Sequence, residues 1–174
     1  DQHARVVDLR ATDTHARFFL GLVHLRLARW DDAVVDFEHA AHQRNAAPAV
    51  LHNLAFAFER KGEPAKARDA LHEAIKRGGE HDARVHTSHA VLALRDGDLA
   101  AAEASFVAAR PLYAGRAPSP AWFHYAALCY ALGGKSEQAI GLLQEGVAAY
   151  PHAAVLHNNL SVVLERAGRD KESL

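Results

Sequence analysis

The sequence has few of the residues on which disulfide frameworks and metal clusters depend. It contains one cysteine and no methionine, and aromatic residues make up only 7% of its 174 positions. A lone cysteine excludes an internal disulfide and any zinc site built from several cysteines. Strand signals are missing too, since no run alternates polar and apolar residues and no Asn-Gly turn occurs. The apolar runs fall far below the roughly 20 residues that a membrane span needs. We therefore expect no direct insertion into a membrane.

An excess of charge of either sign is also absent. The chain has 20 basic and 21 acidic residues, a formal net charge of −1, and neither half is strongly basic. A nucleic-acid partner is therefore not expected, because such partners usually require a basic surface. Apolar residues make up 49% and charged residues 24%, which is typical of a folded chain. Alanine alone supplies 37 residues, and this small-residue bias favours closely packed helices.

The absence of methionine and the start at Asp1 suggest a piece excised from a longer protein. The compartment is left open, with the cytoplasm slightly favoured over the periplasm. Arginine outnumbers lysine by 15 to 5, and together with the alanine excess this suggests a bacterial genome rich in GC.

What the sequence does contain is an internal repeat. The segment AVLHNLAFAFERKGEPAKARDAL at 49–71 is echoed by AVLHNNLSVVLERAGRDKESL at 154–174. The pattern that begins at Leu54 recurs 34 residues earlier, 35 residues later, another 37 later, and a final 34 later. The units expected are 14–47, 48–82, 83–119 and 120–153, with partial units at 1–13 and 154–174.

This spacing resembles the tetratricopeptide repeat, a 34-residue helix–turn–helix whose pattern includes Leu-Gly-x2-Tyr, Ala-x3-Phe and a closing Pro. Leu20-Gly21-x2-His24 and Ala33-x3-Phe37 match parts of that pattern, as does Ala139-x3-Leu143 with Pro151. The departures are His86 and His89, which replace large apolar residues, and three residues inserted after Arg110. The resemblance implies an all-α, right-handed solenoid of four full repeats with flanking partial ones.

Helical periodicity and turn residues support the same fold. Arg17, Leu20, Gly21 and His24 share one helical face, and glycines at 62, 97, 134 and 168 mark turns between paired helices. Asp31 and Ser136 are predicted N-caps, and Ser119-Pro120 is predicted to open a helix. The predicted helices are 14–28 and 31–45, 48–61 and 64–77, 83–95 and 98–110, 120–132 and 136–149, and 154–167 with another from 169. Residues 2–10 are predicted to be the last helix of a preceding unit.

No enzyme class is supported by the remaining motifs. The thirteen histidines include close pairs such as His86 with His89 and His39 with His42, but neither pair has an obvious third and fourth metal ligand. We interpret them as polar substitutions or solvated surface, and expect no metal and no cofactor. Cys129 reads as a small packing residue. The acids at 31, 32 and 36 are interpreted as a solvated helix face.

The groove formed by the first helix of each repeat is the expected site, because the resemblance implies that this surface binds peptides or helices. With Leu51, Leu54, Ala55 and Phe58 on the core face, residues on another helical face form an apolar stripe edged by charge. In a solenoid this stripe would be continuous. The alternative to a binding surface is that the stripe packs against an adjacent segment of the same protein. The predicted lining residues are Phe18, Leu22, Leu25, Arg26, His52, Phe56, Glu59, Arg60, Thr87, Val91, Leu94, Arg95, His124, Leu128, Asn158 and Val162.

The leading hypothesis is a non-catalytic scaffold or adaptor that binds an apolar or amphipathic partner segment in this groove. A second is that the chain is the adaptor region of a larger enzyme, such as a glycosyltransferase or kinase. A third is a self-associating protein, or one that assembles pili or the cell envelope. The resemblance also implies small GTPases among the partners of such repeats.

The sequence further predicts that the third unit is the least well packed. Replacing both His86 and His89 with leucine is then expected to stabilise the array, because well-fitting apolar groups stabilise core positions.

Overall fold

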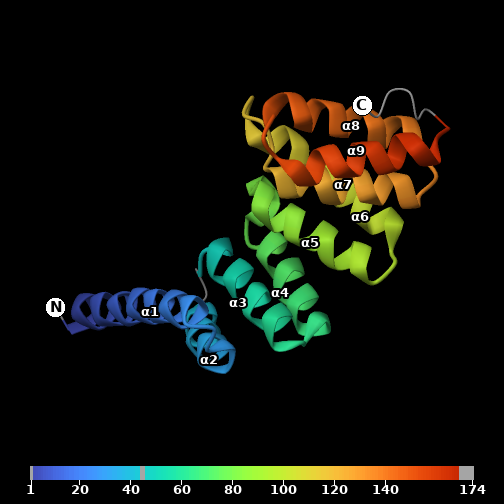
Figure 1. The fold of residues 1–174 in the computed structure, drawn as a ribbon. Coiled ribbons are helices and arrows are strands. Elements are labelled where there is room, and N and C mark those ends of the chain that lie inside the picture. The colour runs from blue at the N-terminus through green and yellow to red at the C-terminus, as the bar shows by residue number, and fades with distance from the viewer. Residues whose placement is uncertain (1, 44–45, 169–174) are drawn as a thin grey trace. The chain divides into compact units, whose positions relative to one another are not determined.

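The computed structural model describes residues 2–43 and 46–168, with side chains from residue 13 onward. These residues form nine α-helices and two short 3-10 helices, and no strand occurs among them (Figure 1). The prediction of an all-α chain is therefore confirmed. The chain divides into two compact units, Asp1–His81 and Asp82–Leu174.

The first unit contains two helix hairpins. Helix α1 (Gln2–Arg26) pairs with α2 (Trp30–Ala41), α3 (Pro48–Lys61) pairs with α4 (Pro64–Lys76), and α2 packs on α3. A 3-10 helix η1 (Gly79–His81) follows α4. The predicted separate helix over 2–10 is wrong, because α1 runs without a break from Gln2. Residues 11–13 contain neither glycine nor proline, so nothing in the sequence stops the helix there.

The second unit contains two more hairpins and a single last helix. Helix α5 (Ala83–Arg95) pairs with α6 (Leu99–Ala109), and α7 (Pro120–Leu132) pairs with α8 (Ser136–Ala149), on which α9 (Ala154–Arg166) packs. The 3-10 helix η2 (Arg110–Tyr113) runs from Arg110 into the segment inserted after it. Its Tyr113 packs 6.3 Å from the ring of Trp122. The predicted helix from 169 lies outside the described residues.

Turns and caps follow the sequence signals in part. Gly62, Gly97, Gly134 and Gly168 all have φ between 72° and 86°, a left-handed conformation that disfavours other residues, so the predicted turns are confirmed. Ser119 Oγ accepts a hydrogen bond from Trp122 N at 3.3 Å, as its position before a proline predicted.

The predicted N-caps at Asp31 and Ser136 are wrong. Helix α2 begins at Trp30 with Arg29 as its N-cap, and α8 begins at Ser136 itself with Lys135 as its N-cap. Both helices therefore start one or two residues earlier than a side-chain cap at these positions requires.

The core of every hairpin uses the same order of side-chain sizes on its second helix. In each helix hairpin, three positions of the second helix are almost completely buried. The first is a small residue, the second, four positions later, is a large one, and the third, three positions beyond that, is small again. These sets are Ala33, Phe37, Ala40; Ala67, Leu71, Ala74; Ala102, Phe106, Ala109; and Ala139, Leu143, Gly146. The repeat seen in the sequence is thus a repeat of packing.

Glycine replaces alanine where a ring approaches the helix most closely. A Cβ added at Gly146 would lie 2.9 Å from Phe123 Cγ, and one at Gly21 would lie 2.7 Å from Phe37 Cε1. Real side chains do not pack that closely, so the ring would have to move. In contrast, a Cβ at Gly141, on the same helix as Gly146, would meet nothing within 4 Å.

Gly146→Ala should therefore lower the free energy of unfolding by about 1–3 kcal/mol, as overpacking of a filled core does. Gly141→Ala should raise it by about 0.5–1 kcal/mol, because alanine loses less conformational entropy in a helix. Urea denaturation followed by circular dichroism measures both. Equal effects of the two substitutions would contradict the close approach of Phe123.

One acid predicted to be solvated is buried. Asp36 is only 3% exposed, although the sequence groups it with Asp31 and Asp32 on a polar face. Arg17 Nη1 donates to Asp36 Oδ1 at 2.9 Å, and His24 Nδ1 lies 2.8 Å from Asp36 Oδ2. The helical face of Arg17 and His24 therefore supplies the polar partners that a buried carboxylate needs. Leu20, predicted on that face, is 42% exposed.

Asp36→Asn should lower the free energy of unfolding by about 1.5–3 kcal/mol, because a buried group loses charge-assisted hydrogen bonds from Arg17 and His24. The matched control is Glu38→Gln, an exposed acid on the same helix, which should change it by less than about 0.5 kcal/mol. Chemical denaturation compares the two. Similar losses in both variants would show that burial of Asp36 adds nothing.

His86 and His89 are less buried than the core positions that the sequence predicts for them. Both are half-buried, whereas Val85, Ala90 and Leu92 of the same helix are buried. His89 Nδ1 lies 2.8 Å from Ser105 Oγ, and Ser105 is itself buried. Leucine at position 89 would leave that hydroxyl without this partner.

We therefore expect His89→Leu alone to destabilise the protein, by about 1–3 kcal/mol for the hydrogen bond lost to a buried group. Adding Ser105→Ala should recover most of that loss, because both polar groups are then removed together. A double-mutant cycle measured by urea denaturation gives the coupling. A gain in stability from His89→Leu alone would restore the expectation drawn from the sequence.

Candidate functional site

The predicted groove residues lie on the first helix of each hairpin and on α9. In the first unit they come from α1 and α3, which contact each other, and in the second unit from α5, α7 and α9. The helical phase used to choose them is correct for α3, since Leu51, Leu54, Ala55 and Phe58 are all buried. On α3 the stripe lies on a different face from these buried residues.

In the first unit, the apolar part of the stripe is partly exposed. Phe56 is 44% exposed, and Phe18, Leu22 and Leu25 are half-buried. The Phe18 ring lies 6.0 Å from the core ring of Phe37. Because α1 and α3 contact each other, these side chains belong to neighbouring helices of one unit.

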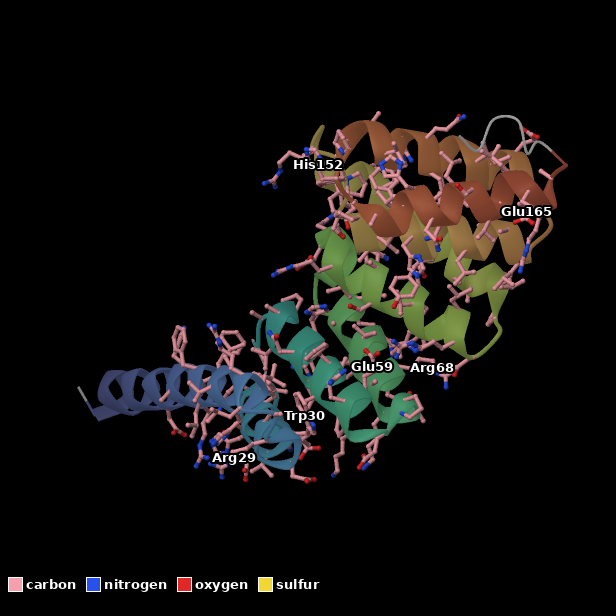
Figure 2. The ribbon with its side chains drawn as sticks, in the orientation of Figure 1. Arg29, Trp30, Glu59, Arg68, His152 and Glu165 are labelled. Atoms are coloured by element: carbon pink, nitrogen blue, oxygen red, sulfur yellow. The ribbon has the colours of Figure 1, made fainter. Side chains whose placement is uncertain are left out.

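The charged edge of this stripe contacts the rest of the unit. Arg60 Cζ lies 5.0 Å from the centre of the Trp30 ring. Figure 2 shows Trp30 at the start of α2, beside α3. A guanidinium over an indole face is attracted by the ring's electrons. Glu59 and His52 are half-buried, and Arg26 is exposed. Arg60 thus has an intramolecular contact and is not a bare surface charge.

On α5 the predicted stripe is only partly a surface. Leu94 is 9% exposed and belongs to the core of the second unit, so it does not contribute to an open groove. Thr87 Oγ1 donates to Ala83 O at 2.6 Å and lies 3.3 Å from the Tyr113 hydroxyl. Val91 is half-buried against the core, whereas Arg95 is exposed. The Thr87 hydroxyl is therefore in contact with Tyr113, a residue of the inserted segment whose contacts the sequence did not reveal.

Three predicted residues meet in one hollow between α7 and α9. His124 and Leu128 come from α7 and Val162 from α9, and Leu128 and Val162 are each 39% exposed. The hollow has a volume of about 80 Å³. Its lining residues, which define the α7–α9 hollow, are His124, Ala127, Leu128, Ala131, Leu143, Asn159, Val162, Val163 and Arg166. Its floor is apolar and its ends are polar.

The polar end of the α7–α9 hollow is a hydrogen-bonded pair. Asn159 Nδ2 lies 2.5 Å from His124 Nδ1, which fixes both side chains. The sequence placed Asn158 in the groove, but Asn158 is exposed and Asn159 lines the hollow. In the second repeat, Asn53 holds the place equivalent to Asn159, and its Nδ2 donates to Ala49 O at 2.7 Å. The match between Asn53 and Asn159 in the two similar segments is the feature of the sequence from which a polar role of Asn159 could have been predicted.

The described residues offer little for catalysis or metal binding. Among them, no group of three or more histidine, cysteine, aspartate or glutamate side chains is placed to hold a metal ion. Cys129 is buried as predicted, and burial raises the pKa of its thiol, with the nearby Glu103 charge adding to the effect. A thiol with a raised pKa stays protonated at neutral pH and is a poor nucleophile. In the described part of the chain, every helix is too short or too polar to cross a membrane.

Comparison with protein-family models assigns most of the repeats. Two models described as tetratricopeptide repeat match, one at residues 52–117 and the other at 121–153, which together are more than half of the chain. A comparison with curated protein sequences gives no match.

Solved structures share the fold at low sequence identity. MamA matches with a TM-score of 0.80 and 15% identity, over 94% of this chain and 87% of that one. PilF of Pseudomonas aeruginosa matches with a TM-score of 0.79 and 18% identity, over 94% and 74%. YrrB matches with a TM-score of 0.78 and 13% identity, over 100% and 88%. These likenesses confirm the predicted solenoid of helix–turn–helix repeats, and with the matching family models they show that the chain belongs to the tetratricopeptide repeat family.

Proposed function

We propose that this chain is a non-catalytic protein-interaction module that binds a partner segment through apolar side chains on the first helices of its repeats. Tetratricopeptide repeats support a scaffold role in general. Binding through apolar side chains of the first helices is supported by the α7–α9 hollow, which is lined by predicted stripe residues of two helices and has an apolar floor. We further propose repeat units at 14–47, 48–82, 83–119 and 120–153, with a partial unit at 154–174; residues 2–13 extend the first helix of the first of these units.

The make-up of the α7–α9 hollow favours an apolar anchor in the bound segment. Leu128 and Val162 expose apolar surface beside a fixed polar pair, and a small cavity suits one aliphatic side chain. Burying such a side chain contributes about 1.5–3 kcal/mol, whereas an exposed ion pair contributes about 0–1 kcal/mol. Apolar contacts should therefore dominate the affinity.

The polar groups around the α7–α9 hollow are placed to orient the bound segment by hydrogen bonds. The Asn159–His124 pair lies at the surface of the hollow, and Arg166 is exposed at its lining. Polar groups of this kind add specificity more than affinity. In the first unit, Phe56 and the half-buried side chains of α1 form the corresponding surface. YrrB is described as having an unusual peptide-binding site, which supports a peptide as the class of partner for this fold.

The test is selection of peptides from a random library on the immobilised chain, followed by titration of the selected peptides. Each peptide should bind at least tenfold more weakly to Leu128→Ala or to Phe56→Ala than to the original protein, since a buried apolar contact is lost. The matched controls are Leu132→Ala, another exposed leucine on α7, and Val35→Ala on the second helix α2. Helical content should be unchanged in all four variants.

Salt separates this proposal from its electrostatic alternative. The dissociation constants should change little between about 50 and 200 mM salt, because apolar burial is not screened as surface charges are. Peptides that bind with a steep salt dependence, and bind both Leu128→Ala and Phe56→Ala at full strength, would contradict the proposal.

A further inference from the structure

The second unit has a larger hollow on the opposite side of α7. Positions 122 and 130 of α7 lie on one side of this helix, and positions 124, 128 and 131 lie on the other, because each residue advances the helix by about 100°. Helix α6, the 3-10 helix η2 and α8 complete the hollow, whose volume is about 330 Å³. Its lining residues, which define the α6–α8 hollow, are Phe106, Val107, Arg110, Pro111, Trp122, Tyr130 and Leu142.

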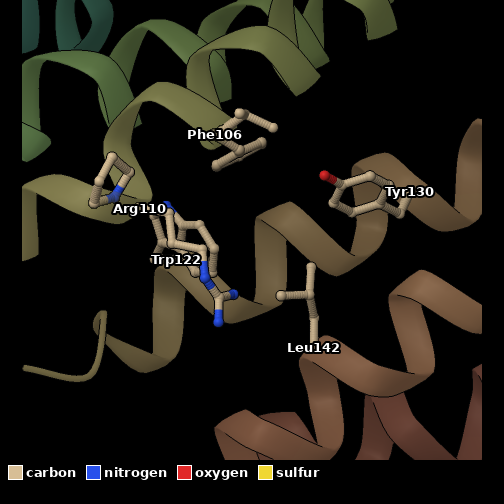
Figure 3. Close-up of a pocket in the computed structure, with 7 residues that line it drawn as sticks. Phe106, Arg110, Trp122, Tyr130 and Leu142 are labelled. Carbon is tan, nitrogen blue, oxygen red and sulfur yellow. The ribbon is translucent and has the colours of Figure 1, made fainter. Parts of the chain in front are cut away.

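Rigid aromatic walls shape the α6–α8 hollow. Phe106 and Trp122 are almost completely buried, with ring centres 6.0 Å apart and an interplanar angle of 89°. Figure 3 shows Phe106, Arg110 and Trp122 on one side of the hollow, and Tyr130 and Leu142 on the other. Aromatic rings favour edge-to-face contacts with other rings, so these walls suit a further ring.

The charges at the rim are already neutralised within the unit. Arg110 Nη2 donates to Glu145 Oε2 at 2.6 Å, and the guanidinium lies 5.7 Å from the centre of the Trp122 ring. Lys135 Nζ lies 2.6 Å from Glu103 Oε1 and 5.7 Å from the centre of the Tyr130 ring. The Glu103 carboxylate raises the pKa of Lys135, so this lysine remains charged and paired. Each cation has its own acid, which favours a neutral ligand over a charged one.

One polar atom in the wall has no partner. The indole Nε1–H of Trp122 is buried, and no residue in the described part of the chain accepts its hydrogen bond. A buried donor without an acceptor costs about 1–3 kcal/mol, so such groups are uncommon in folded proteins. Arg110 lies over this ring and pairs with Glu145, and its side chain is 45% exposed, so a ligand that reaches the buried indole has to displace this side chain.

We propose that the α6–α8 hollow binds an aromatic side chain of a partner peptide, with a carbonyl of that peptide accepting the Trp122 Nε1 hydrogen bond. The volume lies at the lower end of the range of about 300–1,000 Å³ seen for ligand pockets, which suits one ring and its flanking peptide groups. The site is separate from the α7–α9 hollow, and it gives the chain a second recognition surface on the other side of α7.

The indole proton itself reports on this binding. Tryptophan occurs twice in the chain, and Trp30 belongs to the first unit, so Trp30→Phe leaves Trp122 as the one source of an indole signal. The probe is N-acetyl-phenylalaninamide, a neutral aromatic residue with two peptide carbonyls. Its titration into ¹⁵N-labelled Trp30→Phe protein should move the Trp122 Nε1–H resonance downfield, with half-saturation on the order of 1 mM for so small a ligand.

Matched variants locate the effect. Val107→Arg, in Trp30→Phe protein, places a long charged side chain on the lining of the hollow and should abolish the shift, whereas Ala104→Arg, exposed on the same helix, should leave it. Leu128→Ala should also leave it, so failure here is distinguishable from failure of the proposed function. N-acetyl-alaninamide, which lacks the ring, should not bind.

Three results would overturn the proposal. The first is an Nε1–H resonance that stays in place as the probe is added. The second is the same shift in Val107→Arg. The third is binding of free phenol at least as tight as that of the amide, which would assign the hollow to a small aromatic molecule instead of a peptide.

Discussion

The structure depends on the close approach of paired helices, which a small residue on one helix makes possible beside a large side chain. On the second helix of each hairpin, the small-large-small order of side chains fills the interface with the neighbouring helices. Where an aromatic ring comes nearest to a helix, the small residue is glycine and not alanine. At Gly146 and Gly21 even a methyl group would collide with Phe123 or Phe37. The spacing of these residues along the chain is what produces the 34-residue repeat, because each hairpin must present the same surface to its neighbour.

Histidines of the first helices provide partners for several polar side chains of the interior. His24 contacts the buried Asp36, His89 contacts the buried Ser105, and His124 contacts Asn159. These histidines pair with a polar side chain of another helix in their own unit. In these three pairs a hydrogen bond crosses a helix interface, which matters because a buried polar group without a partner is costly.

Helix α7 illustrates how one packed helix separates two kinds of surface. Its core side carries Phe123, Ala126 and Ala127, while on either side of that core the chain leaves a hollow. The α7–α9 hollow is small, aliphatic and edged by an amide–imidazole pair. The α6–α8 hollow is larger, is walled by rings and has neutralised charges at its rim. The segment inserted after Arg110 contributes Pro111 to the second of these, which links the departure from the regular repeat to a distinct surface.

The sequence by itself determined the helical fold, the turns and the phase of the core. Glycines at the turns and periodic small residues are local signals, and they predicted the bounds of α3 and α7 because backbone sterics and helical spacing act over a few residues. The continuous α1 was missed because a repeat boundary was expected where no residue stops a helix.

Tertiary structure alone decided which polar and apolar side chains are exposed. Asp36 lies beside exposed acids in sequence, yet it is buried because Arg17 and His24 of another helix meet it there. Leu94 shares the helical phase of the groove but is covered within its unit, and Asn159, not Asn158, lines the α7–α9 hollow and contacts His124. The aromatic hollow was not visible in the sequence, since residues from α6, η2, α7 and α8 form it only after the helices pack. Such sites depend on distances between residues far apart in the chain, and helical periodicity carries no information about those distances.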